Sequence, residues 1–193
     1  MSNESKERLS NYEKIVAEVV GERIIVWDPQ KGSKLYAEGF YGKPIGIRKP
    51  KTPIFEKPLE LSILEALYLL EKGRIKIIDE NGKELSFEEL KNKFKDIHEK
   101  LEEKYIVYRD LRDKGYVVRP GMKFGADFAV YEHGPGIDHA PFLVHVLPFN
   151  VRISPIEIVR AGRLATTVRK KFVIATVTLN KKPIYYVFSW MRL

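Results

Sequence analysis

Cysteine is absent from the 193 residues of this chain, and long apolar runs are absent as well. Without cysteine there is no disulfide scaffold, no thiol nucleophile and no cysteine-based zinc or iron–sulfur site. No apolar stretch approaches the roughly 18 residues that a membrane-spanning helix needs. The opening residues, MSNESKERLS, contain no apolar signal-peptide core. We therefore expect a cytoplasmic protein that is not integral to a membrane.

Acidic residues are scarce in the last quarter of the chain. Residues 149–193 contain nine lysines and arginines but a single acid, Glu157. Because the net charge of the whole chain is +8, this quarter carries all of the excess. A concentrated positive surface favours a polyanion, nucleic acid first, since each cation that meets a phosphate releases counterions. A solvated basic face and a socket for an acidic protein are the alternatives.

What the chain does have is the composition of a folded protein, with 44% hydrophobic and 31% charged residues. In its first half, β-rich residues 15–20 and 23–27 are separated by a Gly-Glu pair and predict a hairpin. Residues 29–58 are irregular, and residues 43–58 hold four prolines, five basic residues and one acid. Proline excludes a regular helix there, so we expect an extended, exposed loop.

The rest of the first half alternates between helix and strand. Helical periodicity covers residues 59–72, and residues 74–79 predict a strand. Ser86 and Glu89 have the spacing of a capping box, which predicts a long helix that begins there and runs through residue 111.

In the second half, five strand-like segments accompany one helix, residues 154–168, which begins with a Ser-Pro pair. The strands are predicted at residues 116–119, 126–132, 141–147, 172–178 and 184–190. The whole pattern predicts an α+β fold. We expect a small N-terminal α/β domain, residues 1–98, and a C-terminal domain with a mixed sheet flanked by helices, residues 99–193.

The turn from Tyr131 to His139 is the first place that offers chemistry. Two glycines and a proline make it tight, with Tyr131 at its base and His139 at its exit. Its two histidines and two acids are a donor set that suits a metal ion. An imidazole is equally suited to general acid catalysis. Surface histidines with no role are the plain alternative.

Two further groups lie closer to the C-terminus. Arg163 on the predicted helix and the cations of residues 169–171 suit a grip on phosphate, or are ordinary charge at a helix C-terminus. In the last strand, alternation places Tyr186, Phe188 and Trp190 on one face. Such a stripe favours a core or a subunit interface, with a platform for stacking on unpaired bases as the alternative.

A metal-dependent nuclease site is a separate alternative. It needs one carboxylate and a Glu-x-Lys motif on adjacent strands, which hold Mg²⁺ and orient a water molecule. Asp127 supplies a first carboxylate, but the next strand reads Leu143-Val144-His145 and contains no acid. The sequence therefore lacks the ligands for that mechanism.

One series of motifs resembles a known family, the archaeal tRNA-splicing endonucleases. The resemblance is close over residues 101–190 and looser over residues 24–28 and 64–69. Its motifs are Gly115-Tyr116-Val117-Val118, residues 123–128, Tyr131, residues 139–146, residues 162–165 and residues 168–172. The resemblance implies a C-terminal nuclease domain and an RNA endonuclease that cuts precursor tRNA. Cutting at the bulge–helix–bulge boundaries of introns, without a metal or other cofactor, is also implied.

The same resemblance assigns roles to particular residues. The tyrosine, histidine and lysine of the family fall on Tyr131, His139 and Lys170. Tyr131 is the implied base on the 2′-hydroxyl, and with an ordinary pKa near 10 a tyrosine in this role needs help from neighbouring positive charge. His139 is the implied acid for the leaving 5′-oxygen, and Lys170 neutralises the charge on phosphorus. Arg163, and Trp190 with it, match residues that stack on a bulge nucleotide.

Two departures from the family pattern bear on partners. Self-assembling members carry an acidic loop between the last two strands, whereas residues 179–183 read Leu-Asn-Lys-Lys-Pro here. By charge, this chain cannot supply that loop to its own copy. It resembles the catalytic subunit of an α₂β₂ heterotetramer of the crenarchaeal type, with the acidic loop on a separate structural subunit.

The second departure is the basic insertion at residues 43–58. Catalytic chains of the crenarchaeal branch carry a similar loop as an extra RNA contact. Arg48, Lys49 and Lys51 are the candidates here, and a merely solvated loop is the alternative. The alternative for the whole chain is a non-catalytic subunit that only binds RNA or holds a partner.

Overall fold

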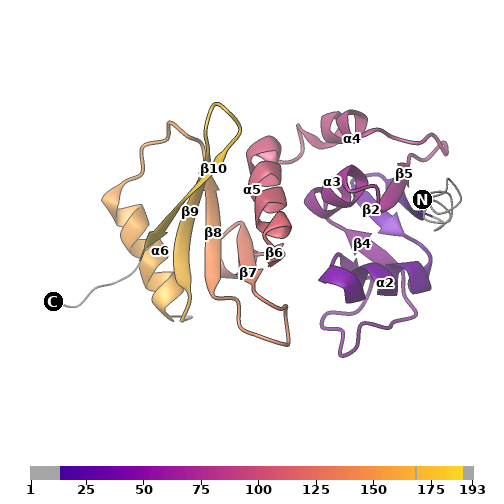
Figure 1. Cartoon of the computed structure of the whole chain (residues 1–193), viewed down its shortest axis with the longest axis horizontal. Coiled ribbons are helices and arrows are strands. Elements are labelled where there is room, and N and C mark those ends of the chain that lie inside the picture. The colour runs from indigo at the N-terminus through magenta and orange to yellow at the C-terminus, as the bar shows by residue number, and fades with distance from the viewer. Residues whose placement is uncertain (1–13, 168, 189–193) are drawn as a thin grey trace, which may run out of the picture. The chain divides into compact units, whose positions relative to one another are not determined.

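The computed structural model describes residues 14–167 and 169–188, and it confirms an α+β protein (Figure 1). The chain divides into two compact units, Met1–Phe94 and Lys95–Leu193, which are described here one at a time. Within the described residues, no helix combines the length and the apolar character that crossing a membrane requires.

The first unit is built on a five-stranded sheet in the order β3-β4-β2-β1-β5. Its strands are β1 (Ile15–Val20), β2 (Arg23–Val26), β3 (Lys43–Pro44), β4 (Leu59–Leu61) and β5 (Ile75–Ile78). β1 and β2 form the predicted antiparallel hairpin, and Gly21 adopts the positive φ of 60° that their tight turn requires. β1 runs parallel to β5, and the other pairs are antiparallel.

A helix in this unit corrects the expectation that residues 29–58 are irregular. Helix α2 spans Pro29–Gly39. The carboxylate of Asp28 caps it by accepting from the amides of Gln30 and Lys31 at 2.9 and 3.2 Å. Proline is favourable at the first helical position because the N–H that it lacks has no partner there. The Asp-Pro pair was therefore a helix signal, and only the later prolines mark a loop.

Two other predicted helices are divided in the structure. Residues 59–72 begin as strand β4, and helix α3 (Ile63–Glu71) follows after the capping residue Ser62. The long helix predicted from Ser86 is two helices, α4 (Phe87–Phe94) and α5 (Leu101–Asp113). Lys100 has a φ of 55°, and a left-handed residue cannot continue a right-handed helix. The domain boundary that we predict between residues 98 and 99 falls in this break.

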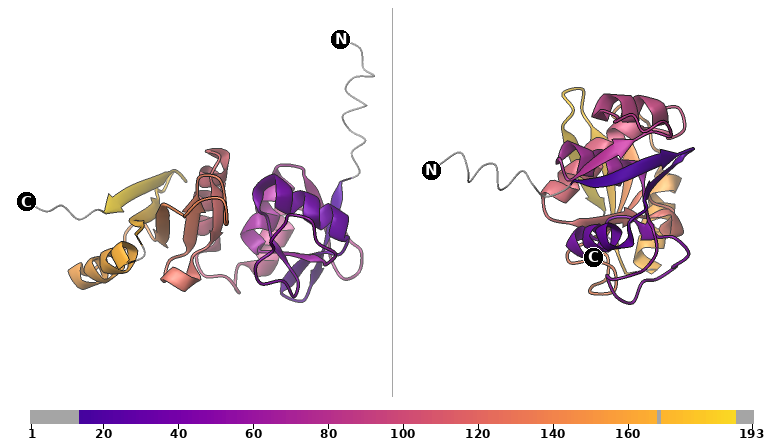
Figure 2. Two further views of the ribbon diagram at one scale, coloured as in Figure 1. Left: turned by 90° about the horizontal axis from the view of Figure 1, so that it is seen from below. Right: turned by 90° about the vertical axis from the view of Figure 1, so that its right-hand side faces the viewer.

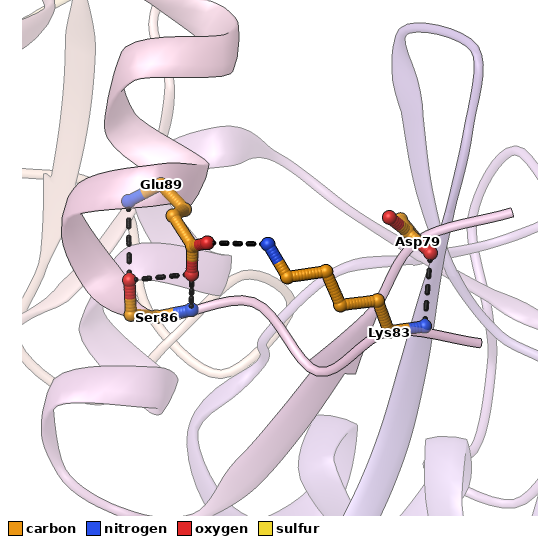
Figure 3. A network of polar contacts seen from close by, with 4 residues as sticks. All are labelled: Asp79, Lys83, Ser86 and Glu89. Atoms are coloured by element: carbon orange, nitrogen blue, oxygen red, sulfur yellow. Dashed lines mark hydrogen bonds and ion pairs between the residues drawn. The ribbon is translucent and has the colours of Figure 1, made fainter. Parts of the chain in front are cut away.

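The predicted capping box of α4 is present and is part of a larger network (Figure 3). The Ser86 hydroxyl accepts from the amide of Glu89 at 3.3 Å, and the Glu89 carboxylate accepts from the amide of Ser86 at 2.9 Å. Lys83 joins this box to the preceding turn, since its ammonium group lies 2.6 Å from Glu89 and its amide donates to Asp79. The side chain of Lys83 thus holds the start of α4 against the turn that follows β5.

The proline-rich segment is anchored rather than fully extended. Its first residues form strand β3, and Phe55 is buried, with 8% of its surface exposed. Ser33 of α2 exchanges two hydrogen bonds with the backbone of Phe55, at 3.0 and 3.1 Å. Arg48, Lys49 and Lys51 lie between these anchors and are exposed, as the sequence predicts.

The second unit contains the predicted mixed five-stranded sheet, in the order β10-β9-β8-β7-β6 (Figure 1). The strands are β6 (Val117–Pro120), β7 (Phe128–Tyr131), β8 (Phe142–Leu147), β9 (Lys171–Val177) and β10 (Pro183–Phe188). β8 and β9 are parallel, and the other neighbours are antiparallel. The parallel pair is connected through helix α6 (Pro155–Thr167), as a parallel connection requires.

Helices α5 and α6 cover opposite faces of this sheet (Figures 1 and 2). On one face, Tyr108 of α5 packs its ring 6.1 Å from that of Phe128. On the other, Ala161 of α6 lies against a core that includes Leu143 and Phe172. α6 begins as predicted, because the Ser154 hydroxyl accepts from the amide of Glu157 at 3.3 Å.

Candidate active site

Tyr131 is the last residue of β7 and is half-buried at the edge of the core that α6 covers. Burial raises the pKa of its phenol above the ordinary value. The positive charge of Arg119 on β6 acts in the opposite direction, and the negative charge of Asp138 adds to the rise. The sequence led us to expect help from positive charge, but in this chain that help does not overcome burial. The phenol is neutral at neutral pH.

His139 follows β7 after a loop and is exposed. The loop is closed by Asp138, whose carboxylate accepts from the backbone amides of Glu132 and His133 at 3.0 Å and of Gly134 at 2.9 Å. On the other side of His139, Ala140 is buried. The backbone that carries the imidazole is therefore held from both sides.

Lys170 precedes β9 and is half-buried. Its Nζ donates a 2.7 Å hydrogen bond to the carbonyl oxygen of Ala140 and lies 5.6 Å from the centre of the Phe124 ring. One residue further along, the amide of Lys171 donates to Pro141 at 2.8 Å. These contacts place the ammonium group of Lys170 beside the backbone of the residue that follows His139.

The strand register relates Tyr131 to Lys170. Val130 pairs with Phe142, and Phe142 pairs with Lys171. Extended by one residue, the same register aligns Tyr131, Pro141 and Lys170 in a single row across three strands. Residues in one row project on the same face of a sheet, and neighbouring strands are about 4.8 Å apart. Tyr131 and Lys170 therefore share the face that α6 covers, with His139 in the loop that joins β7 to β8.

A groove of about 700 Å³ opens on this face beside α6. Gly162 and Thr166 of α6 form one side, and Lys170 and Phe172 form the other. Within the described part of the chain, neither Tyr131 nor His139 lines the groove. Lys170 thus lies both in the groove and in the row that contains Tyr131, as does Pro141.

The other predicted contacts have separate locations. Arg163 is exposed on α6. Arg48, Lys49 and Lys51 belong to the first unit, whereas Trp190 lies outside the described residues. The basic loop between β9 and β10 is present, and Lys181 in it forms a 2.8 Å ion pair with Glu102.

Asp127, the carboxylate considered for a metal site, is paired with neighbouring side chains and a backbone amide. Its two oxygens lie 2.9 Å from Nζ of Lys104 and 3.0 Å from Nδ1 of His145, and one accepts from the amide of Val146 at 2.8 Å. Burial opposes ionisation, but these partners together hold the pKa of Asp127 far below its ordinary range. Among the described residues, no group of three histidine or acidic side chains is arranged to bind a metal ion.

Two features of the site were not found from sequence. One is the hydrogen-bonding role of Asp138, although an aspartate that closes a Gly-Pro-Gly turn through backbone amides was a detectable signal. The other is the contact between Lys170 and Ala140, which depends on the pairing of β8 with β9. No local pattern reveals that pairing.

Comparisons with known proteins agree with this architecture. Residues 15–91 match the family described as "tRNA intron endonuclease, N-terminal domain", and residues 101–186 match "tRNA intron endonuclease, catalytic C-terminal domain". The chain is 50% identical over 179 residues to a tRNA-splicing endonuclease of Hyperthermus butylicus, covering 92% of this chain and 99% of that protein.

Two further archaeal relatives carry the same name. Over 181 residues the chain is 42% identical to the tRNA-splicing endonucleases of Saccharolobus islandicus and Saccharolobus solfataricus. Each alignment covers 93% of this chain and 100% of the relative. Both units are thus matched, in order and over nearly their full length. The chain belongs to the tRNA intron endonuclease family and is an enzyme.

Proposed function

We propose that this chain is the catalytic subunit of an endonuclease that cuts precursor tRNA at bulge–helix–bulge intron boundaries without a metal ion. Cleavage of a tRNA intron follows from the family. The observation that carries the finer proposal is the placement of Tyr131, His139 and Lys170 around the ends of three neighbouring strands. A phenol, an imidazole and an ammonium group are the parts that metal-free transfer of a phosphodiester needs.

In the proposed reaction the RNA supplies its own nucleophile. Tyr131 accepts the proton of the 2′-hydroxyl, whose oxygen forms a bond to the adjacent phosphorus. The bond from phosphorus to the 5′-oxygen breaks, and His139 donates a proton to that oxygen. The products are a 2′,3′-cyclic phosphate and a free 5′-hydroxyl. Lys170 stabilises the negative charge on the phosphorane oxygens, where a fixed cation has its largest effect.

The raised pKa of Tyr131 defines what this mechanism requires. A neutral phenol is a poor base, so the reactive form is the small fraction present as phenolate. A cation near the phenol increases that fraction, and Arg119 on β6 is the group whose charge acts in that direction. The rate should therefore depend on Arg119 as well as on the three central residues.

Contacts outside the reacting atoms are proposed to hold the RNA. Arg163 would stack on a bulge nucleotide, with Trp190 as a second stacking residue. Arg48, Lys49 and Lys51 would contact backbone phosphates. Replacing these three loop cations with serine should weaken RNA binding and reduce the slope of log affinity against log salt by about two to three. An unchanged slope would remove the loop from the RNA interface.

The partner proposed for this chain is a structural subunit in an α₂β₂ assembly. Lys181 and Lys182 are exposed in the loop between β9 and β10, so the loop cannot present acidic groups to a second copy. We expect light scattering to show a dimer of this chain alone and an active heterotetramer with the partner. A fully active homotetramer would contradict the assignment.

The test of the proposed function is cleavage of a bulge–helix–bulge RNA by the chain assembled with its partner. Replacing the 2′-hydroxyl at the cut site with hydrogen should abolish cutting there, because the nucleophile is gone. Binding of that RNA should be unchanged. The matched control has the deoxy substitution one nucleotide away and should be cut at the normal rate. Cutting at the deoxy site would refute the mechanism.

A further inference from the structure

The loop between Tyr131 and His139 has few backbone constraints of its own. It consists of seven residues, 132–138, and is mostly exposed. Gly134 and Gly136 adopt φ values of 138° and 91°, which side-chain-bearing residues rarely occupy. Such a segment samples many conformations unless a specific contact selects one. The selected conformation decides where the imidazole of His139 lies relative to the phenol of Tyr131.

Asp138 supplies that contact. One of its carboxylate oxygens accepts from the amides of both Glu132 and His133, and the other accepts from the amide of Gly134. The backbone adds two bonds, because the amides of Ile137 and Asp138 both donate to the carbonyl of Gly134 at 3.1 Å. Hydrogen bonds to an ionised carboxylate are among the strongest in proteins. One side chain therefore accepts three of these five hydrogen bonds that close the loop on itself.

We propose that Asp138 is a positioning residue, whose carboxylate fixes the distance between Tyr131 and His139 so that both reach the same phosphodiester. The proposal rests on the catalytic roles proposed above for these two residues. The first amide held by Asp138 belongs to the residue directly after Tyr131, and Asp138 itself directly precedes His139. Among the described residues, no other single side chain links the residue next to Tyr131 with the residue next to His139.

The loop also contains a matched acid that makes no such contact. Glu132 is exposed, and its side chain has no hydrogen bond or ion pair with any described residue. The two acids lie in the same loop and carry the same charge. Replacing Glu132 with glutamine therefore removes one negative charge from the loop without opening the closure, which makes it the control for Asp138.

Asp138 could affect the cleavage rate through its hydrogen bonds or through its charge, and removing Asp138 would change the rate in opposite directions in the two cases. The negative charge of Asp138 contributes to the raised pKa of Tyr131. If this charge were all that mattered, its removal would increase the phenolate fraction and accelerate cleavage. If the hydrogen bonds position His139, their loss slows cleavage, because a misplacement of about 1 Å can cost about a hundredfold in rate. Whether the removal of Asp138 accelerates or slows cleavage therefore distinguishes the charge effect from the positioning effect.

The experiment compares Asp138→Ala, Asp138→Asn and Glu132→Gln with the wild type in the assembled enzyme. Single-turnover cleavage is measured alongside the affinity for RNA that has a 2′-deoxy nucleotide at the cut site. Asp138→Ala should slow cleavage tenfold to a hundredfold while affinity stays within about twofold. Asp138→Asn keeps one acceptor oxygen and should be intermediate. Glu132→Gln should cleave within twofold of the wild type.

Amide hydrogen exchange of the full-length chain tests the closure without reference to activity. The amides of Glu132, His133 and Gly134 should exchange at least tenfold faster in Asp138→Ala, and the β8 amides should not change. Unchanged exchange, or cleavage by Asp138→Ala at or above the wild-type rate, would overturn the proposal. If the wild type cuts no RNA, the proposed function fails, while the exchange result still decides whether Asp138 closes the loop.

Discussion

The ammonium group of Lys170 donates a 2.7 Å hydrogen bond to the carbonyl oxygen of Ala140, the residue that follows His139. The bond crosses from the start of β9 to the start of β8, two strands that run parallel. It holds a cation in place before any RNA binds, and a group that is already oriented stabilises a transition state without further reorganisation.

Lys170→Met keeps much of the side-chain length but removes the charge. We expect single-turnover cleavage to fall at least a hundredfold, because the charge on the phosphorane loses its cation. Lys114→Met is the control, because Lys114 ends helix α5 on the opposite face of the sheet and its ammonium group pairs with Asp110. It should cleave within a few-fold of the wild type. Equal losses in the two variants would indicate a general loss of positive charge rather than a specific role for Lys170.

The pH dependence of a His139→Ala variant isolates Tyr131. With the general acid removed, the remaining rate should follow the phenolate fraction. Because burial raises the pKa of Tyr131, this fraction increases about tenfold per pH unit throughout the neutral range. The logarithm of the single-turnover rate should therefore rise with a slope near one between about pH 6 and 9.

Hydroxide in solution gives the same slope, so the control is the double variant Tyr131→Phe with His139→Ala. Its rate should be at least tenfold lower at every pH, because only hydroxide is left to act as the base. If the double variant cleaves as fast as His139→Ala, hydroxide is the base in both and Tyr131 has another role.

Asp127 is expected to contribute to stability rather than to metal binding. Only 14% of its side chain is exposed. Asp127→Asn should lower the free energy of unfolding by about 2–3 kcal/mol, because Lys104 and His145 lose a buried charged partner. Urea unfolding of Asp127→Asn, Lys104→Met and the double variant measures the interaction free energy between Asp127 and Lys104. Additive losses, or a loss of stability in EDTA, would contradict this account.

The network at the start of α4 predicts how stability changes in acid. The ammonium of Lys83, followed by the amide and hydroxyl of Ser86, lowers the pKa of Glu89 from 4.5 to about 2 (Figure 3). The folded protein thus binds this proton more weakly than the unfolded chain. The stabilisation is complete above pH 4.5 and is lost as the pH falls toward 2. Glu89→Gln should weaken this acid-induced loss of stability in thermal unfolding between pH 2 and 6.

Glu22→Gln is the control for this measurement. Glu22 is exposed in the same unit, and its side chain has no ion pair with the described residues. Its removal should leave the pH dependence of stability as it is in the wild type. If Glu22→Gln and Glu89→Gln change the loss of stability below pH 4.5 equally, the network does not set the pKa of Glu89.

Local signals predicted the fold where a few adjacent residues determine the structure. The capping box at Ser86 and the helix start at Ser154 were predicted correctly because each depends on contacts within four residues. The prediction failed where no nearby sequence pattern marks the feature, or where a local signal was present but was overlooked. The left-handed conformation of Lys100, which divides a predicted helix, has no pattern around it. The helix that begins after Asp28 was missed because the prolines further along outweighed its own Asp-Pro start.

The candidate site could likewise be predicted only where neighbouring residues in the sequence determine the structure. The family resemblance named Tyr131, His139 and Lys170, but their relation depends on the register of β7, β8 and β9. Register is set by the packing of whole strands, so spacing in sequence does not supply it. The closure formed by Asp138 is local, and it was overlooked because the residue was considered only as a metal ligand.

The most direct measurement is the chemistry of the cut ends in the presence of EDTA. The assembled enzyme is incubated with a bulge–helix–bulge RNA, and the fragments are analysed by mass spectrometry. We predict undiminished cleavage, a 2′,3′-cyclic phosphate on one fragment and a 5′-hydroxyl on the other, and the same products formed far more slowly by His139→Ala. Cleavage that stops on chelation, or that leaves a 5′-phosphate, would contradict the mechanism.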